Sequence, residues 1–588
     1  MSETKQLPDR ADLPEALTWD LTKIYADDGA FEEAFQEIVA ELKQADDFKG
    51  TLSQGPAAFK EALEYVLAIS RKLEKLYVYS HLKNDQDTAN TTYQGLYAKA
   101  SNLVAQVSEA IAWFDPELLS MDDATIWGYF DQEPELAIYR HLIEKTVNNR
   151  PHVLPAEQEA LLAGAGEIFG ASGNIFSVLN NADLEFPIVE DENGEKVQLS
   201  HGVYGQLMEN TDRSVREAAF KGLYGVYEQF RNTFAQTLST NIKAHNFKAK
   251  ARHYESARQA ALSANHIPES VYDTLVAVVN EHLPLLHRYM ELRKRLLAVD
   301  TLHMYDVYTP ILGEAPIRYS YEEAVAKAKD ALKPLGEEYL AVVNEAFENR
   351  WIDVVENKGK RSGAYSSGAY DTLPYILMNW NDRLDQLFTL VHEMGHSVHS
   401  YFTRNNQPYV YGDYSIFLAE IASTTNENIL TEYMLQTETD PRVKAYVLNH
   451  FLDGFKGTIL RQTQFAEFEH FMHVEDAKGT PLTSEFLSDS YGELNAKYYG
   501  PSVEKDPEIS LEWSRIPHFY YNYYVYQYAT GFSAASALAK KILTGEPDAL
   551  TKYLTYLKAG NSDYPIEVMK KAGVDMTKAD YIKDAMKV

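Results

Sequence analysis

Apolar residues recur at helical spacing through most of this 588-residue chain. An early example is the face formed by Phe31, Phe35, Ile38, Val39 and Leu42. Longer helices with acidic and basic residues on their outer faces are predicted over residues 213–252 and 268–297. The pattern predicts a mainly α-helical protein. A single core stops growing well below this length, so more than one lobe is expected.

Strand signals interrupt the helical pattern in two places. Residues 184–199 hold two short alternating runs around Asn193-Gly194, a dipeptide typical of a type I′ turn, in which both central residues adopt positive φ. Residues 363–379 are aromatic, β-branched and punctuated by glycine. We expect small β-hairpin elements at both places. We also expect a domain boundary near 200, between residues 1–200 and residues 201–588.

Charge and cysteine content exclude several classes of partner. The chain has 55 basic and 86 acidic residues, a formal net charge of -31, which argues against binding to nucleic acid or to an anionic membrane surface. There is no cysteine, so any metal must be held by His, Asp or Glu. The chain starts without the pattern of a signal peptide, and no apolar run near 18 residues is evident, so we expect a cytoplasmic protein with no membrane partner.

The stretch His392-Glu393-Met394-Gly395-His396 lies inside an apolar-periodic segment. On a helix, two histidines four residues apart lie on one face and can bind a single metal ion. Glu393 projects beside them, where it can take a proton from a metal-bound water, the arrangement of a zinc metallopeptidase. Gly395 is costly inside a helix, so another element is expected to approach closely there.

The third ligand is expected on the next helix. From His396 up to Thr403 the rise is about 10 Å, and from Tyr414 back to Glu420 it is about 9 Å. An antiparallel pair of helices therefore returns Glu420 to the level of the histidines. With one position left open, His392, His396 and Glu420 would form a catalytic zinc site with one ion.

Two other residues compete for the ligand role. Glu427 lies two turns beyond Glu420 on the same stripe, and it either replaces Glu420, bonds a ligand histidine or is a surface acid. His399 lies about 10 Å along the axis from His392, too far to share one ion comfortably, and is interpreted as a supporting or structural histidine.

The strand-like region just before the motif offers an edge for substrate. An extended peptide can add to an exposed strand edge through its main chain, so that its side chains are not read. Gly363, Ala364 and Tyr365 are the candidate substrate-binding residues. The alternative is a small hairpin that serves only as a structural flap.

Taken together, these stretches resemble the thimet oligopeptidase family of zinc peptidases, and within it the bacterial oligoendopeptidase F branch. The matching stretches are His392-Glu-Met-Gly-His396 with Ser-Val-His399, Glu420-Ile-Ala-Ser-Thr with Glu427-Asn428, Gly363-Ala-Tyr-Ser with Pro374-Tyr-Ile-Leu-Met-Asn379, Thr18-Trp-Asp-Leu21, and Tyr305-Asp-Val-Tyr-Thr-Pro310. The resemblance implies a clam-like helical body whose two lobes enclose a deep channel with zinc at its floor. Residues 201–588 would then be the catalytic region, and the substrates would be short unstructured oligopeptides cut at internal bonds.

The resemblance also implies a histidine and tyrosines near the C-terminus that polarise the scissile carbonyl. The candidates are His518, Tyr521 and Tyr528, which share one stripe if residues 516–528 are helical throughout. Where the thimet branch has its second tyrosine, this chain has Gln527.

Two alternative functions stay open at this level. One is an exopeptidase on the same zinc site, which would need a charged anchor for a free peptide terminus. The other is a peptide-binding protein with an inert motif. The sequence does not decide between a monomer and a homo-oligomer.

Overall fold

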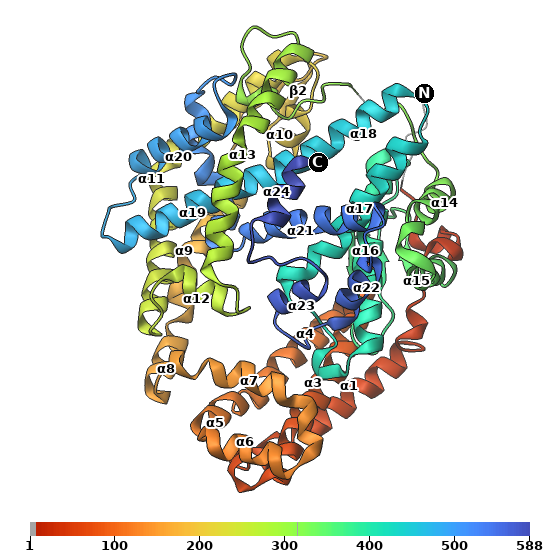
Figure 1. The fold of residues 1–588 in the computed structure, drawn as a ribbon, viewed down its shortest axis with the longest axis vertical. Coiled ribbons are helices and arrows are strands. Elements are labelled where there is room, and N and C mark those ends of the chain that lie inside the picture. The colour runs from red at the N-terminus through yellow and green to blue at the C-terminus, as the bar shows by residue number, and fades with distance from the viewer. Residues whose placement is uncertain (1–6, 314) are drawn as a thin grey trace. The chain divides into compact units, whose positions relative to one another are not determined.

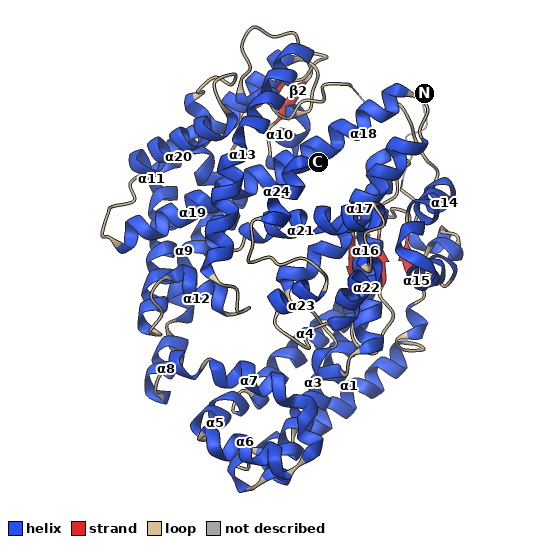
Figure 2. Ribbon diagram, in the orientation of Figure 1, coloured by secondary structure: helices blue, strands red, loops and turns tan. Residues whose placement is uncertain are grey.

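The computed structural model describes residues 7–313 and 315–588. Helices dominate the ribbon (Figure 1), and the strands of the described residues form two small sheets (Figure 2). The prediction of a mainly α-helical fold with small β elements in these two regions is confirmed.

The chain forms two compact units, each assembled from separated segments. The first takes the residues up to Arg150 together with Ile317–Tyr433 and Leu538–Val574. The second takes Pro151–Pro316, Met434–Ala537 and Asp575–Val588. This division does not coincide with the expected boundary near residue 200, because each unit draws on distant parts of the chain.

The first unit is built from helices around a buried core. Its helices are α1 (Asp28–Leu42), α2 (Ala45–Phe48), α3 (Pro56–Gln86), α4 (Thr91–Ile111), α5 (Phe114–Ser120), α6 (Asp123–Gln132), α7 (Arg140–Asn148), α14 (Tyr321–Ala331), α15 (Gly336–Glu348), α16 (Leu384–Asn406), α22 (Ala549–Ala559) and α23 (Pro565–Lys571). The Asn90 side chain caps α4 by accepting the N–H groups of Thr92 and Tyr93. Phe31, Tyr79 and Tyr375 belong to one buried cluster, which joins α1 and α3 to a small sheet.

That sheet has three strands in the order β3-β5-β4. The strands are β3 (Ile352–Asp353), β4 (Tyr365–Ser367) and β5 (Tyr375–Leu377). β5 is central and wholly buried, parallel to β3 and antiparallel to β4. β4 is therefore an edge strand, and it packs against α16. The sheet thus fixes a free strand edge beside the helix that carries the histidine motif.

The second unit is also mainly helical. Its helices are α8 (Ala156–Gly164), α9 (Gly166–Val178), α10 (His201–Met208), α11 (Arg213–Ala251), α12 (Ala257–Ser263), α13 (Glu269–Leu296), α18 (Pro441–Gly454), α19 (Arg461–Ala477), α20 (Ser484–Tyr499) and α24 (Asp580–Lys587). The boundary between the two units falls inside α17 (Ile416–Thr437) and α21 (Tyr526–Leu543). The Ser200 side chain caps α10 by accepting the N–H of Val203.

The hairpin of the second unit forms where expected, but its turn differs from the prediction. β1 (Ile188–Glu190) pairs antiparallel with β2 (Lys196–Gln198). Gly194 has a φ of 75°, whereas Asn193 does not have positive φ, so the turn is not type I′. The carboxylate of Asp191 accepts the N–H groups of Asn193 and Glu195 and stabilises a longer loop instead.

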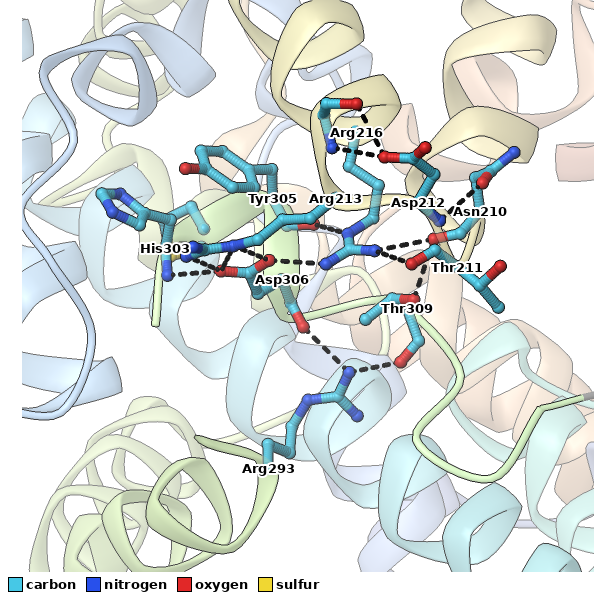
Figure 3. A network of polar contacts seen from close by, with 12 residues as sticks. Asn210, Thr211, Asp212, Arg213, Arg216, Arg293, His303, Tyr305, Asp306 and Thr309 are labelled. Atoms are coloured by element: carbon cyan, nitrogen blue, oxygen red, sulfur yellow. Dashed lines mark hydrogen bonds and ion pairs between the residues drawn. The ribbon is translucent and has the colours of Figure 1, made fainter. Parts of the chain in front are cut away.

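A buried charge network ties the start of α11 to residues 303–309 (Figure 3). Asp306 is fully buried and accepts hydrogen bonds from Arg213 and Arg216. Burial raises the pKa of Asp306, but these partners outweigh burial and hold it below its ordinary value. Arg293 of α13 donates to the backbone oxygens of Asp306 and Thr309. The network explains why the conspicuous stretch Tyr305–Pro310 is structural in this unit.

One helical stretch of the described residues, Ala156–Asp183, has the length and composition of a membrane span. Its mean hydropathy is 1.2, and 11% of that window is buried. No apolar run of this length is expected from the sequence, because glycine, serine and asparagine lie between the apolar residues here. A single stretch of this kind is weak evidence for a membrane, since helices of other proteins pass the same test.

Candidate metal centre

The two motif histidines lie on one face of α16. Leu387 and Val391 are buried on that helix and supply its apolar stripe. The four-residue spacing brings His392 Nε2 to 3.2 Å from His396 Nε2. The Nε2 atoms of both imidazoles therefore face the same position.

The following helix, α17, returns Glu420 to this point. Glu420 Oε2 lies 3.4 Å from His392 Nε2 and 3.5 Å from His396 Nε2. The two helices can approach because Gly395 has no side chain, and a Cβ there would lie 2.6 Å from Ser423 Cα. The expected close approach at Gly395 is confirmed.

The three donor atoms have the spacing of ligands around one zinc ion. Bonds of about 2.0–2.1 Å at tetrahedral angles separate two ligand atoms by about 3.3 Å. The separations here are 3.2, 3.4 and 3.5 Å. Two imidazoles and a carboxylate also match the donor set of catalytic zinc sites, which keep a fourth position open. Within residues 7–313 and 315–588, His392, His396 and Glu420 are the group found with metal-binding geometry.

Glu427 lies behind His392 and outside this set. The Nδ1–H of His392 donates to Glu427 Oε1 over 2.5 Å, which leaves Nε2 for a metal. Burial works against the charged imidazole, but hydrogen bonds with Glu420 and Glu427 outweigh it and raise the pKa of His392 to about 10. Burial likewise opposes the Glu420 carboxylate, while His392 and His396 lower its pKa. A metal bound here would take the place of the His392 proton.

His399, one turn further along α16, is a packing residue. It is 1% exposed, and its ring stacks on Tyr414 with the centroids 3.7 Å apart. Burial holds the pKa of His399 well below its ordinary value, so the imidazole is neutral. The residue lies outside the group with metal-binding geometry.

Glu393 is the buried acid beside the two histidines. It is 7% exposed, and burial raises its pKa, although His392 and His396 act in the opposite direction. A carboxylate with a raised pKa is a better proton acceptor near neutral pH than an ordinary glutamate.

The candidate substrate-binding residues lead into and begin the edge strand β4. Gly363 has a φ of 85°, which turns the chain before the strand. Ala364 follows, and Tyr365 begins β4. Ser366 Oγ lies 2.8 Å from Ser397 Oγ. Because Ser397 directly follows His396, this contact attaches the strand to the motif helix next to a histidine of the site.

The Tyr365 side chain anchors the strand from its other side. Its hydroxyl donates to Asp85 Oδ2 over 2.8 Å, and its ring stacks on His81 with the centroids 5.4 Å apart. Burial, with Asp85 adding to it, raises the pKa of Tyr365. The tyrosine therefore has a structural partner in α3.

The aromatic segment near the C-terminus lies in the second unit and is not one helix. A 3₁₀ turn, η13 (Pro517–Tyr520), carries His518, and α21 begins only at Tyr526. The rings of Tyr521 and Tyr528 nevertheless lie 5.5 Å and 6.2 Å from that of His518, centroid to centroid. Residues 516–528 are therefore not one continuous helix, as the shared stripe required. The rings of His518, Tyr521 and Tyr528 nevertheless lie close together.

Tyr524 also belongs to this group, although the sequence did not single it out. Its ring lies parallel to His518 at 6.3 Å, and its hydroxyl lies 3.4 Å from that of Tyr528. Tyr524 lies three residues after Tyr521 and four before Tyr528, so its spacing would also place it near their helical stripe. Burial lowers the pKa of His518, which favours the neutral imidazole.

Comparison with known proteins agrees with this geometry. The model of peptidase family M3 matches residues 206–588, and the model described as oligopeptidase F matches residues 117–186. The group B oligopeptidase PepB of Streptococcus agalactiae is 55% identical over 98% of this chain and 96% of its own length.

Solved structures are also similar to this chain in sequence and fold. The crystal structure of oligoendopeptidase-F from Enterococcus faecium is 67% identical, covers 95% of this chain and 96% of its own, and has a TM-score of 0.75. The crystal structure described as that of a putative peptidase from Chlamydophila abortus is 37% identical, covers 99% of this chain and 98% of its own, and has a TM-score of 0.93. On its sequence, its fold and its matching family model, the chain belongs to peptidase family M3.

Proposed function

We propose that this protein is a zinc-dependent oligoendopeptidase that hydrolyses internal bonds of short, unstructured peptides. The observation that carries the proposal is the triangle of His392, His396 and Glu420, with the buried Glu393 on the same helix. These are three ligands and a general base, the complete set that hydrolysis at a zinc site needs. The cytoplasm, which is the expectation from the sequence, is the proposed compartment.

The ligand residues would hold one zinc ion, and the rest of the chemistry falls to the protein's own groups. When bound, zinc supplies a Lewis acid that lowers the pKa of a water toward neutrality. Glu393 takes the proton of the attacking water and then passes it to the leaving amine. Glu427 holds the His392 ring in the tautomer whose Nε2 is free, through the 2.5 Å hydrogen bond at Nδ1.

The free edge of β4 would hold the substrate in extended form. Main-chain hydrogen bonds from Ala364 and its neighbours fix the peptide in one register without selecting for particular side chains. His518 and a tyrosine of its group donate to the substrate carbonyl oxygen as negative charge develops on it. Endopeptidase action on oligopeptides is supported by the names of the relatives, an oligopeptidase and an oligoendopeptidase.

A digest of a mixed peptide library tests the proposal. The library holds peptides of graded length, each with free ends and with acetylated and amidated ends. We expect internal cleavage of the short members, equal with free and blocked ends, complete loss with a chelator and recovery on addition of zinc. Activity that resists the chelator would overturn the zinc assignment, and activity that needs a free end would overturn internal cleavage in favour of an exopeptidase.

A further inference from the structure

The turn that gathers His518 and the tyrosines has an unfavourable backbone. Asn522 and Tyr523 have φ values of 50° and 58°, so two consecutive non-glycine residues lie in the left-handed region. This conformation costs about 1–2 kcal/mol for Tyr523 and less for Asn522, because asparagine tolerates the left-handed region. The turn lies between His518 and Tyr521 on one side and Tyr524 on the other, so its shape decides whether these rings meet. Something outside the segment must hold it.

Glu469 of α19 makes the contact that holds the turn. Glu469 is fully buried, and its Oε1 accepts the backbone N–H of Tyr523 over 2.6 Å. The other oxygen, Oε2, is buried and meets no hydrogen-bond donor in the part of the chain that the structure describes. Burial raises the pKa of Glu469 to about 8, so the side chain is uncharged at neutral pH. Its one hydrogen-bonded oxygen, Oε1, accepts from the backbone of the turn.

The Tyr523 side chain fastens the same turn to the core of the second unit. It is 3% exposed, and its hydroxyl lies 3.1 Å from His470 Nδ1. Its ring packs against Tyr272 at 5.6 Å and against His473 at 4.7 Å, centroid to centroid. Tyr523 is thus buried, whereas Tyr521, two residues earlier, is 57% exposed. Tyr523 therefore anchors the turn, while Tyr521 is exposed and Tyr524 and Tyr528 are half-buried.

We propose that Glu469 is a positioning residue, which holds the left-handed turn at Asn522 and Tyr523 and thereby keeps His518, Tyr521 and Tyr524 gathered for the reaction. The inference rests on the proposed function, because it gives those rings a part in the chemistry. Glu469 accepts a hydrogen bond from the backbone of the turn, so its effect on catalysis is indirect.

Two substitutions of Glu469 separate the effect of its hydrogen bond from the effect of having a side chain buried at this position. Glu469→Gln keeps an acceptor of the same shape and is neutral, as the buried acid is at pH 7. Glu469→Leu keeps the volume but removes the acceptor. We expect Glu469→Gln to retain the wild-type kcat, and Glu469→Leu to lower kcat about 10- to 100-fold with KM and bound zinc unchanged, since small misplacements of a catalytic group cost this much.

The matched control is Gln464→Leu, which replaces another buried polar residue of α19. The Gln464 side chain donates to Asn495 Oδ1 of α20 rather than to the turn backbone, so kcat is expected to stay at the wild-type value. A rescue adds a second readout. Glycine adopts positive φ without strain, so Asn522→Gly placed in the Glu469→Leu protein should restore part of kcat.

A wild-type kcat in Glu469→Leu, or an equal loss in Glu469→Gln, would overturn the inference. If Glu469→Leu does not fold, Glu469→Asp decides, because it withdraws the acceptor by one methylene. A wild-type kcat there also overturns it. Glu393→Gln is measured beside these variants. If Glu393→Gln is inactive while Glu469→Leu is fully active, only the positioning role fails, whereas an active Glu393→Gln removes the proposed function itself.

Discussion

Gly395 of α16 and Ser423 of α17 lie in backbone contact, so close that a Cβ on Gly395 would come within 2.6 Å of Ser423 Cα and 2.9 Å of Ala422 O. This contact is what brings the two helices near enough for Glu420 to reach the histidines. A single hydrogen atom in place of a side chain thus decides whether the three donor atoms meet.

Substitution of Gly395 by alanine should disrupt the metal site by pushing α16 and α17 apart. The added methyl group meets backbone rather than a flexible side chain, so α17 must move. Such overpacking costs about 1–3 kcal/mol, and displacement of Glu420 weakens the ligand set. We expect a lower Tm and a zinc affinity reduced at least about 10-fold, the loss typical of a disturbed metal site. Thermal unfolding and competition with a chromophoric chelator measure the two effects.

Gly95→Ala is the control for this substitution. Gly95 lies within α4 of the same unit, and a Cβ there meets nothing within 4 Å. Alanine is the better helix former by up to about 1 kcal/mol, so this variant should be as stable as the wild type or more so. Equal behaviour of the two alanine variants would contradict the importance of the Gly395 contact.

Removal of Glu427 should weaken metal binding without removing a ligand. Glu427→Ala takes away the acceptor of the His392 Nδ1–H, so the ring loses its fixed tautomer and orientation. Loss of such a partner lowers metal affinity about 10- to 100-fold. Glu432→Ala, further along α17, is the control and should bind zinc like the wild type. An unchanged affinity in Glu427→Ala would assign Glu427 to the surface instead.

His518 should matter for turnover and not for the metal. Loss of one hydrogen-bond donor to a developing oxyanion lowers kcat about 10²- to 10³-fold. We expect His518→Ala to show this loss in steady-state kinetics while zinc content stays constant. His282→Ala serves as the comparison, because His282 Nδ1 bonds a carbonyl of its own helix. A wild-type kcat in His518→Ala would leave the aromatic group without a part in the chemistry.

Glu469 gives the stability of the protein a defined pH dependence. Its pKa is about 8 in the folded protein against an ordinary value of 4.5, so the folded state keeps a proton that the unfolded chain loses. Its contribution to stability is therefore fully present below pH 4.5 and is lost as the pH rises toward 8. Relative to wild type, Glu469→Gln should gain on the order of 5 kcal/mol across this window, at about 1.4 kcal/mol per pKa unit.

Unfolding of wild-type and Glu469→Gln protein at pH 5 and at pH 8 measures this difference. The two Tm values should be closer at pH 5 and diverge at pH 8, with the variant the more stable protein. A constant difference between them, or a wild type that gains on the variant as the pH rises, would show that Glu469 is not held neutral in the folded state.

Features set by local pattern could be predicted from the sequence. The helix of His392 and His396 follows from apolar spacing, and the return of Glu420 follows from helical rise, because both depend on regular geometry alone. Ser200 as a cap and the hairpin at residues 184–199 are equally local. The hairpin turn was missed because the Asp191 carboxylate stabilises a longer loop, which pattern alone does not reveal.

Features that depend on distant contacts could not be predicted. Tyr523 has no local reason to adopt positive φ, and the residue that bonds its backbone, Glu469, lies about fifty residues earlier in the chain. The two units also interleave segments far apart in sequence, so a boundary read along the chain does not describe them.

The central claim is that Glu393 is the base beside a zinc site made by its helical neighbours. Its most direct test is Glu393→Gln, with zinc content and peptide turnover measured on the same preparation. We expect one zinc per chain, as in the wild type, and a kcat lower by about 10²- to 10⁴-fold, the usual contribution of a general base. Turnover at the wild-type rate with zinc in place would contradict the account.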